Sequence, residues 1–139
     1  MLTAQQRQAT LEFLSSHPVM VIATTDRQCM PGAAVILFAE TPDLDIIFGT
    51  HPTRKYHNLK QNPKAALAFS KGWQSLQMHG AAVELSGPEL ERMKALFVVK
   101  HPEYDRHVLT GSVFFKFTPQ WMRFMDNGSE PPVRWEASY

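Results

Sequence analysis

The segment GTHPTRK at residues 49–55 carries two hydroxyl side chains, Thr50 and Thr53, and two adjacent cations, Arg54 and Lys55. Thr53 is a good N-cap residue, so both cations fall in the first turn of a predicted helix, where the positive end of the helix dipole disfavours them. Residues that contradict a local structural preference in this way suggest a functional role. Backbone N–H groups at a helix start, two hydroxyls and two basic side chains together suit a phosphate monoester. The simpler interpretation is that both cations are solvated surface residues.

The elements that would position these side chains are a strand, a short helix and a second strand. A β-rich run at residues 45–48 precedes the segment, and the helix is expected to end at Asn62-Pro63 before an apolar strand at residues 65–69. Upstream, a capping-box pattern predicts a helix over residues 3–15. Apolar runs at residues 19–24 and 33–38 then predict the first hairpin.

The remaining part of the chain predicts further strands and helices. In order they are a strand over residues 74–85, a helix over 86–100, one or two helical turns over 103–109, and strands over 113–118 and 121–125. The last two are expected to form a hairpin that turns at Pro119-Gln120. The segment at residues 128–132 is expected to be extended and able to reach a partner subunit.

Several predicted strands are apolar at consecutive positions, where a sheet with one solvated face would alternate. Both faces must therefore be covered, as in a barrel whose outside packs against helices and a second subunit. Buried parallel strands would give the same pattern. Most strands follow one another through short turns, which argues against a doubly wound fold. The excess of apolar strand surface predicts a homodimer.

Composition narrows the class of protein and its partners. The chain has 139 residues, 44% of them hydrophobic, which suits one domain with a true core. A net charge of +1, with both signs intermixed, gives no electrostatic footprint for nucleic acid or an anionic membrane. The sequence contains neither a signal peptide nor an apolar run near the ~20 residues of a membrane span. The single cysteine, Cys29, agrees with a reducing compartment, so we expect a cytoplasmic protein.

The order and spacing of these features resemble the pyridoxamine 5′-phosphate oxidase-like family of FMN-binding split barrels. The resemblance covers roughly residues 8–126 and rests on Thr-x-x-Thr-Arg-Lys from Thr50, on Asn-Leu-x-x-Asn-Pro from Asn58, and on Pro31-Gly32. It implies a mainly β (α+β) fold, a six- to seven-stranded antiparallel split β-barrel with flanking short helices. One FMN-binding domain would span residues 1–139.

The resemblance also implies FMN as the cofactor and assigns residues to it. Arg54, Lys55 and Thr50 correspond to the residues that hold the FMN phosphate, with Thr53 as a neighbour. The further candidates for cofactor binding are His51, Val35, Ile36, Gln74, Ser75 and Gln77. Val35 and Ile36 would supply backbone and apolar contact to the flavin ring, and one of the three polar residues would face it. His51 either approaches the flavin or is a surface turn residue.

Acid–base and metal signals are sparse in this sequence. None of the six histidines falls in a metal motif, and a single cysteine excludes cysteine-rich zinc sites, so we assign no metal site. The sequence has no nucleophile elbow, and we assign no catalytic residue. A flavin brings its own redox chemistry, and the protein need only bind and orient it. The leading hypothesis is therefore an FMN-dependent oxidoreductase acting on an unidentified small molecule.

Two alternatives remain open at this point. One is a flavin-binding or sensing protein without turnover, and the other is a barrel that binds the deazaflavin F420 or haem, as some relatives do. Vitamin B6 oxidation itself is not expected. The oxidase of that name has basic residues at both ends of the strand matching residues 33–38, and Arg-His and Arg-Leu-x-Pro near its C-terminus, all of which this chain lacks.

Overall fold

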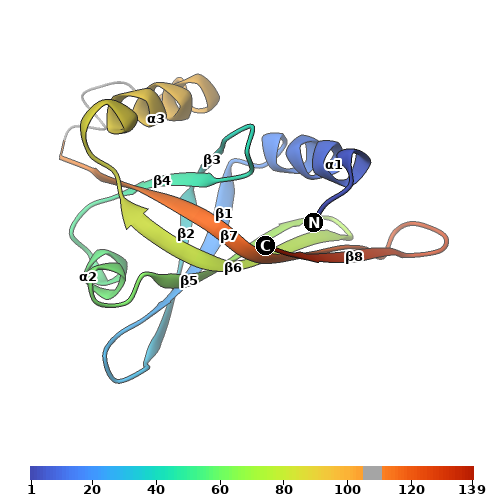
Figure 1. Ribbon diagram of the computed structural model, residues 1–139, viewed down its shortest axis with the longest axis horizontal. Coiled ribbons are helices and arrows are strands. Elements are labelled where there is room, and N and C mark those ends of the chain that lie inside the picture. Colours follow the sequence, from blue (N-terminus) through green and yellow to red (C-terminus); the bar gives the residue numbers. More distant parts are fainter. Residues whose placement is uncertain (105–110) are drawn as a thin grey trace.

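An antiparallel sheet curls into half a barrel, and three helices lie at its margins (Figure 1). The computed structural model describes residues 1–104 and 111–139. In chain order the elements are α1 (Ala4–Ser15), β1 (Val19–Thr25), β2 (Pro31–Leu37), β3 (Ala39–Glu40), β4 (Ile46–Thr50), α2 (Arg54–Gln61), β5 (Lys64–Lys71), β6 (Gln74–Glu84), α3 (Gly87–Lys100), β7 (Val113–Asp126) and β8 (Val133–Ser138). The predicted helical turns over residues 103–109 fall almost entirely outside the described part.

The strands are ordered β2-β1-β5-β6-β7-β4-β3, and β8 pairs with β7 outside this path. Every pairing between them is antiparallel. The long strand β7 changes partner along its length, because residues 113–117 pair with β4 and residues 121–126 pair with β8. The mainly β, antiparallel split-barrel fold expected from the sequence is thus confirmed.

The predicted hairpin at Pro119-Gln120 is wrong, because β7 runs straight through both residues. Pro119 has no N–H, and it lies where the pairing of β7 with β4 has ended and the pairing with β8 has not begun. Proline is tolerated within a sheet where such a pairing is interrupted or where a strand is bulged. On the other side, Pro119 pairs with Gly80 at a register shift of β6, and a Cβ at Gly80 would lie 2.2 Å from the Thr118 carbonyl oxygen. Gly80 is therefore a point of close approach between β6 and β7.

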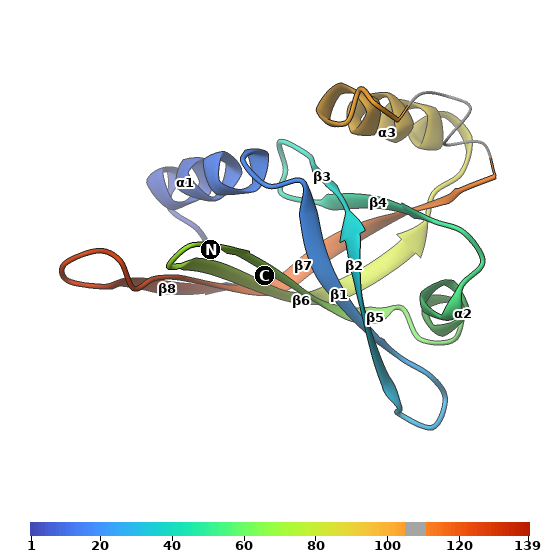
Figure 2. The ribbon, with the colours of Figure 1, turned by 180° about the vertical axis from the view of Figure 1, so that it is seen from behind.

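The end of the chain also differs from expectation. Instead of an extended arm at residues 128–132, the chain turns there and returns as β8 along its own β7. The strand residues Val133, Trp135 and Ala137 alternate with polar residues, and Trp135 stacks on Phe124 of β7 at 5.5 Å. This hairpin projects from the end of the molecule opposite α2, as both ribbon views show (Figure 2).

The core has two clusters of buried side chains, a larger one and a smaller one in which Phe97 of α3 packs with Ile47 and Phe114. Phe48, Leu67 and Phe69 belong to the larger cluster, with 0% to 2% of their surface exposed. Leu37 is only half-buried, because it belongs to the edge strand β2. The described helices leave the convex side of β1 and β2 open, where Val19, Val21 and Val35 are exposed.

Candidate functional site

The turn between β4 and α2 holds the residues that the sequence singled out. Thr50 ends β4, where its backbone pairs with Val113 of β7, and its side chain is buried. Thr53 is the N-cap residue of α2, with an extended backbone (φ −103°, ψ −174°), yet its side chain makes no capping hydrogen bond. The Thr3 hydroxyl, by contrast, caps α1 in a complete capping box. The start of α2 therefore keeps backbone N–H groups that no side-chain cap satisfies.

A directed chain of hydrogen bonds links the side chains of this turn. The Lys55 ammonium donates to the Thr53 hydroxyl oxygen at 3.2 Å, and the Thr53 and Thr50 oxygens are 3.3 Å apart. Thr50 donates its own proton to the His51 carbonyl at 2.8 Å. Thr53 must therefore donate to Thr50, since each hydroxyl has a single proton. The lysine keeps two further N–H donors for a ligand.

The two cations of the turn differ in their surroundings. Arg54 is exposed, whereas Lys55 is half-buried, and this burial lowers the pKa of the Lys55 ammonium below its ordinary value. Among the described residues, neither cation forms an ion pair with a carboxylate. A nearby anion would raise this pKa again, because it stabilises the charged form of Lys55.

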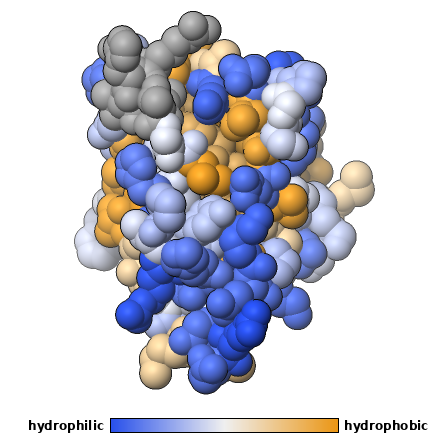
Figure 3. Space-filling model, turned by 90° about the vertical axis from the view of Figure 1, so that its left-hand side faces the viewer, coloured by the Kyte–Doolittle hydropathy of each residue, from blue (hydrophilic) through white to orange (hydrophobic). Residues whose placement is uncertain are grey.

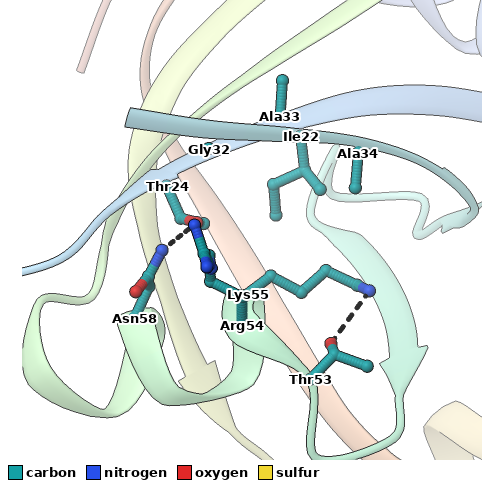
Figure 4. Close-up of a pocket in the computed structure, with 9 residues that line it drawn as sticks. All are labelled: Ile22, Thr24, Gly32, Ala33, Ala34, Thr53, Arg54, Lys55 and Asn58. Carbon is teal, nitrogen blue, oxygen red and sulfur yellow. Dashed lines mark hydrogen bonds between the residues drawn. The ribbon is translucent and has the colours of Figure 1, made fainter. Parts of the chain in front are cut away.

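A pocket of about 200 Å³ lies between the start of α2 and the strands β1 and β2 (Figure 4). It is lined by Ile22, Thr24, Gly32, Ala33, Ala34, Thr53, Arg54, Lys55 and Asn58. Arg54 and Asn58 point from α2 toward the strands, and Lys55 extends along the pocket to Thr53, so the helix side is polar. Ile22, Ala33 and Ala34 make an apolar floor on the strand side. The Asn58 amide donates to the Thr24 hydroxyl at 3.1 Å, and both side chains are buried. This bond fixes α2 against β1.

The structure brings some of the predicted cofactor residues together. Thr53, Arg54 and Lys55 line the pocket, and Thr50 adjoins it through its contact with Thr53. His51 is exposed and lines a different pocket, on the other side of the turn.

The other predicted residues lie away from this pocket within one chain. Ile36 packs against the main core, and Val35 is 69% exposed on the convex face of the sheet. Gln74 donates to Asp126 at 3.1 Å. Ser75 pairs with Met125, and Gln77 is exposed opposite Ala68. Their roles in cofactor binding stay predictions.

Sequence reasoning missed six pocket residues: Ile22, Thr24, Gly32, Ala33, Ala34 and Asn58. Asn58 carried a signal, because it follows Arg54 by four positions and so lies on the same face of the helix. Thr24 carried none, since its partner Asn58 lies 34 residues away in the sequence. Gly32 is half-buried, and a Cβ there would lie 3.9 Å from the Asn58 amide nitrogen, so a larger side chain would narrow the pocket.

The described part of the chain offers no group of three or more His, Cys, Asp or Glu side chains that could hold a metal ion. None of its helices is long and apolar enough to cross a membrane. The fold and the pocket together define a class of protein, an antiparallel split barrel with a pocket that two cations line at a helix start.

The comparison with protein families agrees with this class. The family model described as pyridoxamine 5′-phosphate oxidase matches residues 7–126, so the chain belongs to that family. No curated protein matches the chain.

Solved structures share the fold at low sequence identity. The chain resembles PhzG from Burkholderia lata, with a TM-score of 0.71, 20% identity, and coverage of 97% of this chain and 84% of that one. It also resembles the haem storage protein HutZ from Vibrio cholerae, with a TM-score of 0.72, 17% identity, and coverage of 81% and 88%. A haem-binding protein from Mycobacterium smegmatis gives a TM-score of 0.78, 15% identity, and coverage of 99% and 59%. The chain thus spans little more than half the length of some relatives, including Atu2129 from Agrobacterium tumefaciens at 57%.

Proposed function

We propose that this protein binds FMN and that Arg54 and Lys55 hold the phosphate of the cofactor. One observation carries the proposal. Two cations that have no carboxylate partner in the described part of the chain lie at a helix start that lacks a side-chain cap. A phosphate dianion would satisfy the backbone N–H groups of α2 and accept hydrogen bonds from both side chains. The apolar floor of Ile22, Ala33 and Ala34 suits the less polar remainder of the ligand.

The size of the pocket supports a homodimer. A volume of about 200 Å³ is below the ~300–1,000 Å³ of ordinary ligand pockets, so one chain would enclose only part of the cofactor. Grooves of about 410 and 500 Å³ run along the convex face of β1 and β5, where a second copy would pack. Gln77 is exposed on β6, the next strand of the sheet, and would face the cofactor of the other protomer.

The activity we propose is that of an FMN-dependent oxidoreductase acting on a small molecule in the cytoplasm. Bound FMN supplies hydride or single-electron transfer. The chain's own residues bind the phosphate, orient the cofactor along β2 and, with a second copy, exclude water. No Asp, Glu, His, Cys or Tyr is among the described residues that line the pocket, which agrees with a site that leaves the redox step to the cofactor.

Haem is the second candidate ligand, and the position of His51 favours it. His51 is exposed and lies on the same turn as two cations that would pair with carboxylate groups of a haem. Two of the structural neighbours are named for haem binding or storage. FMN is preferred because the start of α2 offers backbone donors for a phosphate in addition to the cations.

The deciding experiment is the absorption spectrum of the purified protein after incubation with FMN, F420 or haem and removal of the free ligand. We expect retained flavin bands with FMN. If only a Soret band is retained, the ligand is haem and not FMN. If only F420 is retained, the ligand is F420. Reduction of the bound flavin by NADH or NADPH would support an oxidoreductase, whereas a flavin inert to both donors would favour the binding or sensing alternative.

A further inference from the structure

Helix α2 carries the two cations that line the pocket, Arg54 and Lys55, yet the start of this helix is weakly held. Its N-cap residue Thr53 makes no side-chain capping hydrogen bond. Of its eight residues only Asn58 and Leu59 are buried, and both lie in its C-terminal half. The end of the molecule that carries α2 and α3 is mainly hydrophilic around one apolar patch, shown in orange in Figure 3. The position of the two cations therefore depends on how the C-terminal half of α2 is attached to the sheet.

Two asparagine side chains attach this end of α2 to strand β1. The Asn58 amide donates to the Thr24 hydroxyl, and the Asn62 amide donates to the Thr25 hydroxyl, each at 3.1 Å. Successive residues of a strand point to opposite faces, so the two bonds hold β1 from both sides. These two hydrogen bonds are called the asparagine–threonine clamp below.

Asn62 also ends the helix and begins the next strand. Its backbone N–H donates to the Asn58 carbonyl at 2.7 Å, and its side-chain carbonyl accepts from the Lys64 N–H at 3.1 Å. Pro63 favours an extended backbone at the residue before it, and its own carbonyl accepts from Ala82 of β6 at 2.8 Å. The Asn-Leu-x-x-Asn-Pro motif of the sequence thus joins α2 to β1, β5 and β6.

The other described contacts of α2 with the sheet are less able to set its direction. Leu59 belongs to the main core and Tyr56 packs against it. The hydrophobic effect is not directional, whereas a hydrogen bond depends on distance and angle. Lys60 pairs with Glu84 of β6 at 2.9 Å, but both side chains are exposed, and such ion pairs contribute little. The clamp is therefore the contact that sets where the start of α2 points.

A small error at the clamp would be felt at the pocket. Eight residues of helix span about 12 Å, so a tilt of about 5° at the clamp moves the start of α2 by about 1 Å. A binding site must hold its groups to within about 0.5 Å of the productive geometry. A hydrogen bond at the far end of α2 can thus control how the two cations meet a ligand.

We propose that the clamp positions the two cations of α2 for a phosphate group, and that Thr25 and Asn62 are positioning residues of this site. Thr24 and Asn58 line the pocket, so a change in either also alters direct contacts with a ligand. Thr25 and Asn62 are not among the residues that line it, so their effect on a ligand passes through α2. The assignment of the phosphate to FMN rests on the proposed function.

The test compares Thr25→Val, which removes the hydroxyl, with Thr25→Ser, which keeps it. Flavin-fluorescence titrations with FMN and riboflavin give an affinity ratio that isolates the phosphate. Thr25→Val is expected to lower the preference for FMN by about 2- to 12-fold, the contribution of one neutral hydrogen bond, with riboflavin affinity nearly unchanged. Thr25→Ser should keep the preference of the wild type. An unchanged preference in Thr25→Val would overturn the proposal.

Asn62→Ala removes the same bond from the helix side and decides if Thr25→Val does not fold. Where both variants fold, the double variant should lose no more preference for FMN than the larger of the two single losses. Additive losses would show that the two residues act separately, which contradicts the clamp.

A matched control separates positioning from a general loss of stability. Thr10→Val also removes a hydroxyl, one that donates to the Gln6 carbonyl within α1 at 2.7 Å, and it should leave the preference for FMN unchanged. Light scattering accompanies each titration, because Thr25 and Asn62 line the groove of about 500 Å³ on the convex face. An equal loss in Thr10→Val, or a loss found only together with a changed oligomeric state, would overturn the positioning role.

Inorganic phosphate makes the test independent of the flavin. In the wild type, NMR titration with phosphate should shift the backbone amide signals of Arg54 and Lys55, and Thr25→Val should bind phosphate more weakly. Phosphate binding that depends on Thr25 in a protein that binds no FMN would support the clamp and contradict the flavin function. FMN and phosphate affinities that are both indifferent to Thr25→Val would do the reverse. A wild type that binds neither ligand would overturn both proposals.

Discussion

Arg54 and Lys55 are adjacent in sequence but differ in exposure, and their contributions to FMN binding should differ accordingly. FMN and riboflavin differ only in the phosphate, so their affinity ratio isolates the anion site. A charge-assisted hydrogen bond to the phosphate raises the affinity about 10- to 150-fold. Because solvent screens the exposed Arg54, its contribution should lie toward the low end of this range. We expect Lys55→Gln to lower FMN affinity by more than Arg54→Gln does, with riboflavin affinity unchanged.

A flavin-fluorescence titration of both ligands measures these ratios. Lys60→Gln is the matched control, because Lys60 lies on the same helix but pairs with Glu84 at 2.9 Å, away from the pocket. It should keep the preference of the wild type for FMN. If the Arg54 and Lys55 variants also keep it in full, the phosphate is held elsewhere.

The pH dependence of FMN affinity should report the titration of Lys55. Burial lowers the pKa of Lys55 in the free protein, and a bound phosphate dianion raises it again. The contribution of Lys55 to FMN affinity is therefore fully present at pH values below its lowered pKa in the free protein. This contribution is lost as the pH rises through the higher pKa that Lys55 has in the complex. At acidic pH, protonation of the phosphate near pH ~6 weakens binding.

The expected profile is thus a maximum near neutral pH with an alkaline decline. Lys55→Arg keeps its charge throughout, so its alkaline decline should shift to higher pH or disappear. FMN titrations from about pH 5 to about pH 10 measure the profile. An identical alkaline limb in the wild type and in Lys55→Arg would show that another group titrates.

At the scale of elements, the position of α2 depends on one buried side-chain pair. Asn58 donates to the Thr24 hydroxyl, and both side chains are less than 5% exposed. Asn58→Ala leaves that hydroxyl buried without its donor, so we expect the free energy of unfolding to fall by about 1–3 kcal/mol. Urea unfolding measures the loss.

A double-variant cycle tests whether the effect belongs to the pair. Thr24→Val combined with Asn58→Ala should cost less than the sum of the single changes, because both members of the bond are then absent. Gln61→Ala, at an exposed position of the same helix, is the control for helix propensity. Additive costs would mean that the bond does not couple α2 to β1.

The strand that leads into the site is anchored by Phe48. Its side chain is fully buried and stacks on Phe115 of β7 at 5.5 Å. Phe48→Ala should lower the free energy of unfolding by about 3–5 kcal/mol, a large share of the stability of a domain this size. Thermal and urea unfolding measure this loss, with the exposed Val83→Ala as control. Unchanged stability would mean that β4 does not depend on this contact.

Elements that depend on local signals could be predicted from the sequence, and elements that depend on distant partners could not. The Thr3-Gln6 capping box and the position of Arg54 and Lys55 in the first turn of α2 are both encoded within a few residues. The straight course of β7 through Pro119 depends on where two other strands end, which no local pattern contains. Thr24 likewise belongs to the site because of its hydrogen bond with Asn58, which is distant in the sequence.

At the scale of the whole molecule, the convex face of the sheet is the surface that one chain leaves unfinished. Val21 lies between Val35 of β2 and Ala68 of β5, and the exposed fractions of Val21 and Val35 are 39% and 69%. Neighbouring strands thus present a continuous apolar surface, which is rare on a monomer. A specific interface needs more than about 1,000 Å² of buried surface, and a face several strands wide can supply it.

We therefore expect a homodimer that forms through this face and whose dissociation weakens FMN binding. Val21→Lys and Val35→Lys place a charge at the centre of the interface and should convert the protein to a monomer of 15.8 kDa by light scattering at micromolar concentration. Both variants should also bind FMN more weakly, because a pocket of about 200 Å³ encloses only part of the cofactor. Val99→Lys, at the exposed face of α3, should change neither property. A wild-type monomer under these conditions would refute the dimer, and monomeric variants with full FMN affinity would place the whole cofactor site within one chain.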